Sequence, residues 1–115
     1  VTNKPQRLTQ KLLTHFDFPS PPKTVISGDT FDVRKPHPKP LLMAGKDCHT
    51  APNECLYLGD HPRDIEAGKN AKMMTGAALY GYIPLGERFE QWAADHYFAT
   101  PHDMNLFIQN QLKSE

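Results

Sequence analysis

Short apolar runs alternate along this chain with longer segments in which apolar residues recur every three or four positions. The short runs predict buried strands, and the longer segments predict the helices that cover them. The predicted strands lie at 24–27, 55–58, 73–79 and near 97–98. The predicted helices cover 5–16, 40–47, 62–71, 89–93 and 103–111. This alternation indicates right-handed βαβ units, and therefore an α/β fold with a parallel sheet and helices on both faces.

Two of the predicted helices carry an apolar stripe, which indicates the face that packs on the rest of the fold. The stripe consists of Leu8, Leu12, Leu13 and Phe16 in the first helix, and of Leu41, Leu42 and Ala44 or Gly45 in the second. Three aromatic residues near the C-terminus, Phe89, Trp92 and Tyr97, are expected to pack the last helices rather than to bind a ligand.

The composition is that of a soluble globular domain or of a piece of one. Of the 115 residues 38% are hydrophobic, and 13 basic residues balance 13 acidic ones. Nothing in this balance indicates binding to nucleic acid or to a membrane surface, and no apolar run approaches the roughly 18 residues of a membrane span. Cys48 and Cys55 lack zinc-type spacing, so we expect reduced thiols in a cytoplasmic protein.

The most specific chemical signal is a pair of aspartates. Asp60 follows the strand predicted at 55–58, at the sheet edge where ligands of parallel α/β folds bind, and Asp64 lies in the first turn of the next helix. Two carboxylates about 4 Å apart repel by roughly 4 kcal/mol at an effective dielectric of 20, and a bound cation such as Mg²⁺ would relieve this. The alternative is structural, with Asp60 capping the helix while Asp64 and Glu66 stabilise its N-terminus.

Lys35 is a candidate phosphate partner. It lies in a loop that several prolines restrict, so its ammonium can stay at one place on a cleft rim, as a phosphate dianion requires. The alternative is a solvated loop lysine, which is the reading we expect for the neighbouring Arg34 and Lys39.

Thr2 and Asn3 form a second candidate phosphate site. They follow Val1, which is expected to end a strand, and they precede the predicted helix 5–16. A hydroxyl at a strand end, followed by a backbone N–H at a helix start, is a natural anion cradle. The alternative is that Thr2 or Asn3 simply caps the helix.

Together these segments resemble motifs of the haloacid dehalogenase-like phosphohydrolases. The segments are Thr-Asn-Lys-Pro (2–5), Lys-Pro-His-Pro (35–38) and Leu-Gly-Asp-x-x-x-Asp-Ile-x-Ala-Gly (58–68), similar to the second, third and fourth motifs of the family. Gly-Asp-Thr (28–30) and Ala-Leu-Tyr-Gly-Tyr-Ile (78–83) resemble its phosphoglycolate phosphatase group. The latter segment, with Trp92 and Ala94-Asp95 behind it, is similar to the branch that contains N-acetylmuramic acid 6-phosphate phosphatase.

The resemblance implies a Rossmann-like core and hydrolysis of a phosphate monoester through an aspartyl-phosphate, with Mg²⁺ as cofactor. By this likeness Thr2 and the backbone of Asn3 hold the transferring phosphoryl group, and Lys35 neutralises it. Asp60 binds Mg²⁺, and Asp64 binds it or steadies it from close by. The implied substrate is a small phosphorylated metabolite, 2-phosphoglycolate or a sugar phosphate.

One family motif has no match in the chain. The first motif, Asp-x-Asp-x-Thr, supplies the nucleophile from the first strand, upstream of the threonine motif. Asp29 and Asp32 are three residues apart and lie on the wrong side of Thr2. The chain also starts at Val1 without an initiator methionine. We therefore expect residues 1–115 to form the C-terminal part of a single core domain, without its first strand and cap domain, and to be inactive alone.

Two other readings compete with a phosphatase half. A receiver domain also gathers acidic residues, a threonine and a lysine around Mg²⁺, but in the order acidic pair, threonine, lysine; here the threonine and lysine precede the acidic pair. A non-catalytic remnant that binds phosphate and metal, or pairs with a partner chain, agrees with the missing nucleophile. Mg²⁺ and phosphate that raise the melting temperature without turnover would favour this remnant.

Overall fold

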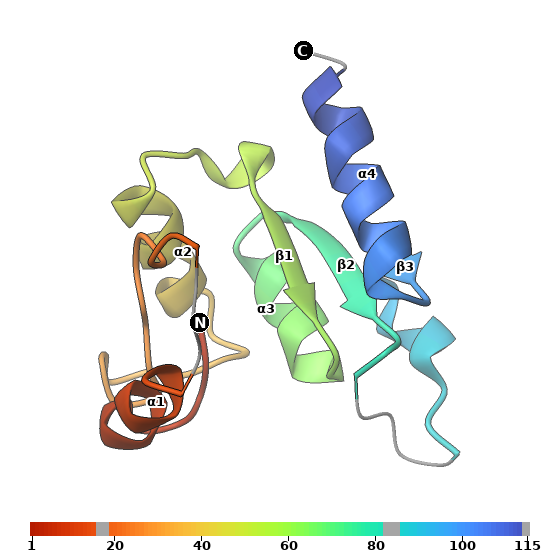
Figure 1. Cartoon of the computed structure of the whole chain (residues 1–115). Coiled ribbons are helices and arrows are strands. Elements are labelled where there is room, and N and C mark those ends of the chain that lie inside the picture. The colour runs from red at the N-terminus through yellow and green to blue at the C-terminus, as the bar shows by residue number, and fades with distance from the viewer. Residues whose placement is uncertain (16–18, 82–85, 114–115) are drawn as a thin grey trace.

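The computed structural model describes residues 1–15, 19–81 and 86–113, with side chains up to residue 111 (Figure 1). Its helices are α1 (Gln6–Leu13), α2 (Lys39–Asp47), α3 (Pro62–Asn70) and α4 (Pro101–Lys113), with short 3-10 turns η1 (Pro52–Glu54) and η2 (Phe89–Trp92). Its strands are β1 (Leu56–Gly59), β2 (Met74–Ala78) and β3 (His96–Phe98). In these ranges no helix is long and apolar enough to cross a bilayer.

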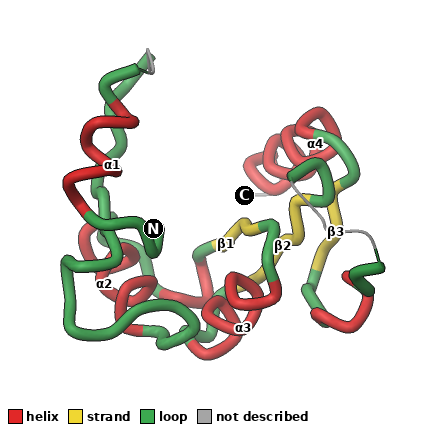
Figure 2. The backbone as a smooth tube through the Cα atoms, turned by 90° about the horizontal axis from the view of Figure 1, so that it is seen from below, coloured by secondary structure: helices red, strands yellow, loops and turns green. Residues whose placement is uncertain are grey.

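The three strands form one parallel sheet in the order β1-β2-β3. Leu56 pairs with Met74 and Gly76 with His96, so the carboxyl ends of the strands meet at one edge. Helix α3 packs on β1 and β2, and α4 lies on the opposite side of the sheet, beside β3 (Figures 1 and 2). The predicted α/β fold with a parallel sheet and helices on both faces is therefore confirmed.

Helix α3 joins two apolar clusters of the core. One cluster contains Leu41, Ala67, Ala71 and Met73, with Cys55 and Tyr57 packed against it. The other contains Ile65, Ala77 and Trp92, with Leu79, Phe89 and Ala94 at its border. Small residues let helix and sheet approach closely, because a Cβ on Gly68 would lie 2.5 Å from Cγ2 of Thr75. The packing role predicted for Trp92 and Phe89 is confirmed.

The strand predicted at 24–27 is wrong. Ile26 and Ser27 are buried, but the segment joins no sheet because its partner is the irregular segment 2–4. Two backbone hydrogen bonds connect them, from Thr2 N to Ile26 O (2.9 Å) and from Gly28 N to Lys4 O (2.7 Å).

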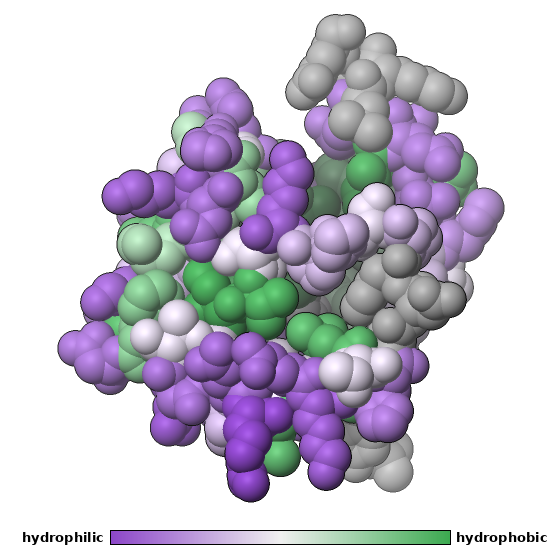
Figure 3. Space-filling view, turned by 60° about the vertical axis from the view of Figure 1, so that its left-hand side comes forward, coloured by the Kyte–Doolittle hydropathy of each residue, from purple (hydrophilic) through white to green (hydrophobic). Residues whose placement is uncertain are grey.

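The apolar stripe predicted to pack α1 on the rest of the fold is only partly buried. Leu8 and Leu12 are 46% and 45% exposed, whereas Thr9 is the buried residue of this helix. Leu42 of α2 is also exposed, while Leu41 is buried. Phe16 lies outside the described residues. Figure 3 shows apolar patches interrupting the polar surface on the side nearer to α1 and α2.

On the side away from β2, strand β1 faces the N-terminal segment across an apolar groove. The groove has a volume of about 170 Å³. Its lining includes Val1, Leu41, Tyr57 and Met73, and both free cysteines. Among the described residues no strand pairs with this edge of β1.

Candidate active site

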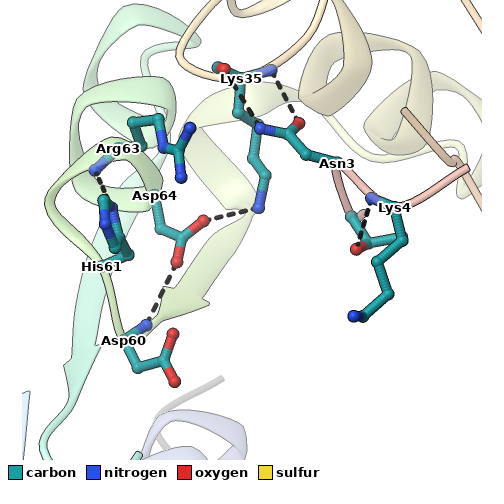
Figure 4. A network of polar contacts seen from close by, with 8 residues as sticks. Asn3, Lys4, Lys35, Asp60, His61, Arg63 and Asp64 are labelled. Carbon is teal, nitrogen blue, oxygen red and sulfur yellow. Dashed lines mark hydrogen bonds and ion pairs between the residues drawn. The ribbon is translucent and has the colours of Figure 1, made fainter. Parts of the chain in front are cut away.

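The carboxyl end of β1 opens into a polar cleft of about 340 Å³. Asp60 directly follows the strand, Asp64 lies in the first turn of α3, and Lys35 reaches in from the loop before α2 (Figure 4). The structure thus brings together three of the predicted site residues. Lys35 comes from a distant segment of the chain, 29 positions before Asp64. A larger cavity of about 680 Å³, under α4 at the other end of the strands, is lined mainly by neutral side chains.

Asp64 is the centre of the site. Its Oδ1 accepts a hydrogen bond from Lys35 Nζ at 2.6 Å, and its Oδ2 accepts one from the backbone N–H of Asp60 at 3.2 Å (Figure 4). Both side chains of the ion pair are only 11% exposed. Gly59 makes this position available, since a Cβ there would lie 2.2 Å from the Cβ of Asp64. Asp64 therefore does more than stabilise a helix terminus, because it ties the lysine to the strand end.

Helix α3 is capped by a residue between the two aspartates. The cap is His61, whose Nδ1 accepts a hydrogen bond from the backbone N–H of Arg63 at 3.2 Å. Asp60 is consequently not the cap, and the structural alternative for this residue is wrong. Its carboxylate lies at the cleft, against the backbone of Gly81, where an added Cβ would meet Asp60 Oδ2 at 2.3 Å.

Lys35 is fixed at both ends, so the reading as a solvated lysine is wrong. The side chain of Asn3 clasps its backbone: Asn3 Oδ1 accepts from Lys35 N at 3.2 Å, and Asn3 Nδ2 donates to Lys35 O at 3.4 Å. Burial lowers the pKa of the ammonium, but the hydrogen bond to Asp64 and the interaction with Tyr57 outweigh this and raise the pKa above its ordinary value. The lysine therefore carries a full positive charge at neutral pH.

Thr2 and Asn3 do not cap α1. The N-cap position is Pro5, and the first helical N–H, of Gln6, donates to Oδ1 of Asp29 at 2.7 Å. Thr2 Oγ1 instead accepts from the backbone N–H of Lys4 at 3.2 Å. Neither Thr2 nor Asn3 is among the residues that line the cleft, whereas their neighbour Val1 is.

Sequence reasoning missed three contributors to the site. They are the side chain of Asn3, the ring of Tyr57 below Lys35, and Gly81 beside Asp60. Of these three, only Gly81 lies in a segment, 78–83, that the sequence analysis singled out for its likeness to family sequences. The contacts of Asn3 and Tyr57 link residues more than 20 positions apart in the sequence.

The donor set suits a magnesium ion that keeps part of its water. No group of three or more His, Cys, Asp or Glu side chains that could hold a metal occurs in the described ranges. Asp60 and Asp64 are the two carboxylates at the cleft. Mg²⁺ is usually bound by one or two carboxylates together with water and substrate phosphate, so a complete protein cage is not required.

Comparison with known proteins identifies the class. The family model described as haloacid dehalogenase-like hydrolase matches residues 1–78, and the chain belongs to this family. The resemblance predicted from the three motifs is thereby confirmed.

Curated relatives and solved structures narrow the likeness. The chain is 40% identical over 102 residues to a phosphoglycolate phosphatase of Xylella fastidiosa, covering 89% of this chain and 44% of the relative. It is 33% identical to an N-acetylmuramic acid 6-phosphate phosphatase of Pseudomonas putida, covering 97% and 50%. A solved structure of a predicted phosphoglycolate phosphatase from Haemophilus somnus superposes with a TM-score of 0.80 at 28% identity, covering 94% and 48%. The chain spans about half the length of the relatives it matches.

Proposed function

We propose that this chain is the phosphate- and metal-binding half of a Mg²⁺-dependent phosphate-monoester hydrolase of the phosphoglycolate phosphatase group. The observation that carries the proposal is the Lys35–Asp64 pair of 2.6 Å, 11% exposed on each side, next to Asp60 at a strand end. The substrate is a small phosphorylated metabolite, 2-phosphoglycolate or a sugar phosphate, as the names of the relatives suggest. The nucleophilic aspartate is supplied by a segment outside residues 1–115.

Lys35 provides the fixed positive charge of this site. Its ammonium has three N–H donors, of which Asp64 takes one and the Tyr57 side chain is a second partner, so one is left for the oxygens of a phosphoryl group. The Thr2 hydroxyl accepts a bond from Lys4 N and can still donate its own hydrogen to the same group, together with the backbone N–H of Asn3. Phosphoryl transfer depends mainly on such positioned charge, because the transition state spreads negative charge over three oxygens.

Mg²⁺ fits beside Asp60, with Asp64 as the nearby anion that steadies it. Both oxygens of Asp64 already accept hydrogen bonds from the chain, whereas no described donor occupies the carboxylate of Asp60. When bound, the ion supplies charge neutralisation for the phosphate. Asp60 contributes its carboxylate as the direct ligand. Asp64 holds Lys35 and the Asp60 backbone in position beside this ligand through its two hydrogen bonds.

The positions of the other aspartates support an inactive isolated chain. Asp29 accepts a hydrogen bond from Gln6 N at the start of α1, and Asp32 pairs with Lys39 at 3.4 Å with 85% of its side chain exposed. Neither lines the cleft. The described residues therefore offer no carboxylate placed as a nucleophile between Lys35 and Asp60.

Turnover of an aryl phosphate by the 115-residue chain, with and without Mg²⁺, tests the proposal together with thermal shifts. We expect no turnover, but a higher melting temperature when Mg²⁺ and inorganic phosphate are added, about 2.7 kcal/mol of added stability at a ligand concentration of 100 times Kd. Lys35→Met and Asp60→Asn should lose the shift, and Asp32→Asn should keep it. An absent shift in the wild type contradicts the binding site, and turnover abolished by Asp60→Asn contradicts the inactivity.

The second candidate function is a binding module that has no catalytic activity even when the missing half is supplied. The remote positions of Asp29 and Asp32 favour it. Supplying a separately expressed upstream half of a relative distinguishes the two. Restored turnover that depends on Lys35 supports the phosphatase half, and ligand binding without turnover in the assembled pair supports the binding module.

A further inference from the structure

The ring of Tyr57 lies beneath the catalytic lysine. Tyr57 is the second residue of β1, and the Nζ of Lys35 is 5.7 Å from its ring centroid. The tyrosine packs against the cluster of Leu41, Ala67, Ala71 and Met73. On α3 a Cβ added to Gly68 would lie 3.7 Å from Cδ2 of the ring. The ring therefore lies between the glycine turn of α3 and the lysine.

We propose that Tyr57 is a positioning residue, whose ring holds the Lys35 ammonium at the height of the cleft and directs its remaining N–H group toward phosphate. The proposal rests on the function proposed above. It adds a residue that neither the ion pair nor the motifs of the sequence point to.

A lysine side chain needs such support because it is long and flexible. Fixing its rotamers costs conformational entropy. Asn3 fixes only the backbone of Lys35, and Asp64 only its terminal nitrogen. An aromatic face attracts an ammonium, and the attraction grows as the pair is desolvated. It adds no formal negative charge, so it does not compete with phosphate for the lysine as a second carboxylate would.

The chemistry of the tyrosine agrees with this role. Burial raises the pKa of the Tyr57 phenol, and the charge of Lys35 and a hydrogen bond between the two side chains lower it by a smaller amount, so the group is neutral at physiological pH. Tyr57→Phe removes the phenol and keeps the ring, and so separates these two contacts. A neutral ring presents its face to the ammonium without neutralising it.

The chain contains a matched control for this arrangement. Lys39 lies 5.1 Å from the ring centroid of Phe31 and 3.4 Å from Asp32. These residues repeat the lysine, ring and carboxylate of the site. Here the lysine and carboxylate are 45% and 85% exposed, against 11% for both in the cleft. Phe31→Leu therefore removes a similar contact in solvent, outside the site.

The experiment compares Tyr57→Leu, Tyr57→Phe and Phe31→Leu by two measurements. The first is the ring-current shift of the Lys35 ε-CH₂ protons in NMR spectra of the chain. The second is the Kd of inorganic phosphate, measured by calorimetry in the presence of Mg²⁺. We expect Tyr57→Leu to lose the upfield shift and to bind phosphate about 5- to 30-fold more weakly, the equivalent of about 1–2 kcal/mol at 1.4 kcal/mol per tenfold. Tyr57→Phe should keep both properties within about twofold, and Phe31→Leu should change neither.

A variant with a fluorinated ring at position 57 keeps the test valid if Tyr57→Leu does not fold. Pentafluorophenylalanine at position 57 keeps the ring volume but reverses the charge distribution of its face, and should weaken phosphate binding as Tyr57→Leu does. Unchanged phosphate affinity in the leucine and fluorinated proteins overturns the proposal, as does a phenylalanine variant as weak as leucine. Should the wild type bind no phosphate, the proposed function fails. The ε-CH₂ shift then still decides whether the ring positions the lysine.

Discussion

Replacing Asp64 by asparagine tests the central ion pair. Asp64→Asn keeps the size of the side chain but removes the charge that neutralises Lys35 at 2.6 Å and accepts from Asp60 N at 3.2 Å. A hydrogen bond to a charged group contributes about 1.5–3 kcal/mol and a neutral one about 0.5–1.5 kcal/mol. Because the amide oxygen can retain one of the two bonds, we expect a net loss of about 2 kcal/mol in the free energy of unfolding.

The measurement is urea unfolding followed by fluorescence. Trp92 is the one tryptophan of the chain and is buried against Ile65 and Ala77, so its emission reports the core next to α3. With an m-value of about 1.3 kcal/mol/M, the loss lowers the urea midpoint by about 1.5 M. Asp32→Asn is the control, since it removes a 3.4 Å pair that is largely exposed and worth no more than about 0.5 kcal/mol.

A double-mutant cycle isolates the pair itself. Lys35→Met and Asp64→Asn should show a coupling energy of about 1–2 kcal/mol, because each removes the charge that the other leaves without a partner. Equal losses for Asp64→Asn and Asp32→Asn, or a coupling energy near zero, would refute the reasoning that burial makes this pair strong.

Three other perturbations have defined outcomes. Gly81→Ala places a Cβ 2.3 Å from Asp60 Oδ2, and should weaken Mg²⁺ binding about tenfold in calorimetry while leaving the fold intact. Asn3→Ala removes both hydrogen bonds to the Lys35 backbone, and should lower the free energy of unfolding in urea by about 1–2 kcal/mol. The pKa of Asp95 is lowered, chiefly by its hydrogen bond from the backbone of β2. Its folded pKa lies below the unfolded value of about 3.9, so its contribution is present above that pH and is lost as the pH falls further; Asp95→Asn should flatten this part of the stability profile.

Each of these predictions has its own contrary result. Mg²⁺ affinity that is unchanged in Gly81→Ala would contradict the steric argument. A free energy of unfolding that Asn3→Ala leaves unchanged would show that the clasp on the Lys35 backbone does not stabilise the fold. A stability profile of Asp95→Asn that parallels the wild type below pH 4 would assign the acid sensitivity to other carboxylates.

Local pattern was sufficient to predict the centre of the fold. Strands β1 and β2 and helix α3 fell where the apolar runs and the helical periodicity placed them, because these elements are short and contiguous, and Gly59 and Pro62 mark the boundary between β1 and α3. The meeting of Asp60 and Asp64 followed from the turn between β1 and α3 at the carboxyl end of the strand, whereas Lys35 reaches them from a loop that follows no strand of the described sheet.

The features that the sequence did not predict depend on contacts between residues far apart in the chain. The run at 24–27 has the composition of a strand, but it is bonded to an irregular segment and so remains outside the sheet. Leu8 and Leu12 have helical spacing, but no described surface covers them. The clasp of Asn3 on Lys35 joins residues 32 positions apart, and no local rule relates an amide side chain to a backbone so far along the chain.

The open edge of β1 sets how firmly the site is held over time. Asp60 follows directly from a four-residue strand that pairs on one side only in the described structure. A strand bonded on one side opens at a smaller free energy than the interior of a sheet, so its amide hydrogens exchange sooner. Opening of β1 would carry Asp60 away from Lys35, which is anchored on the other side of the groove through Asn3. Amide exchange at 56–59 therefore reports how long Asp60 and Lys35 stay on opposite walls of the same cleft, and a ligand that spans Asp60 and Lys35 should slow this exchange.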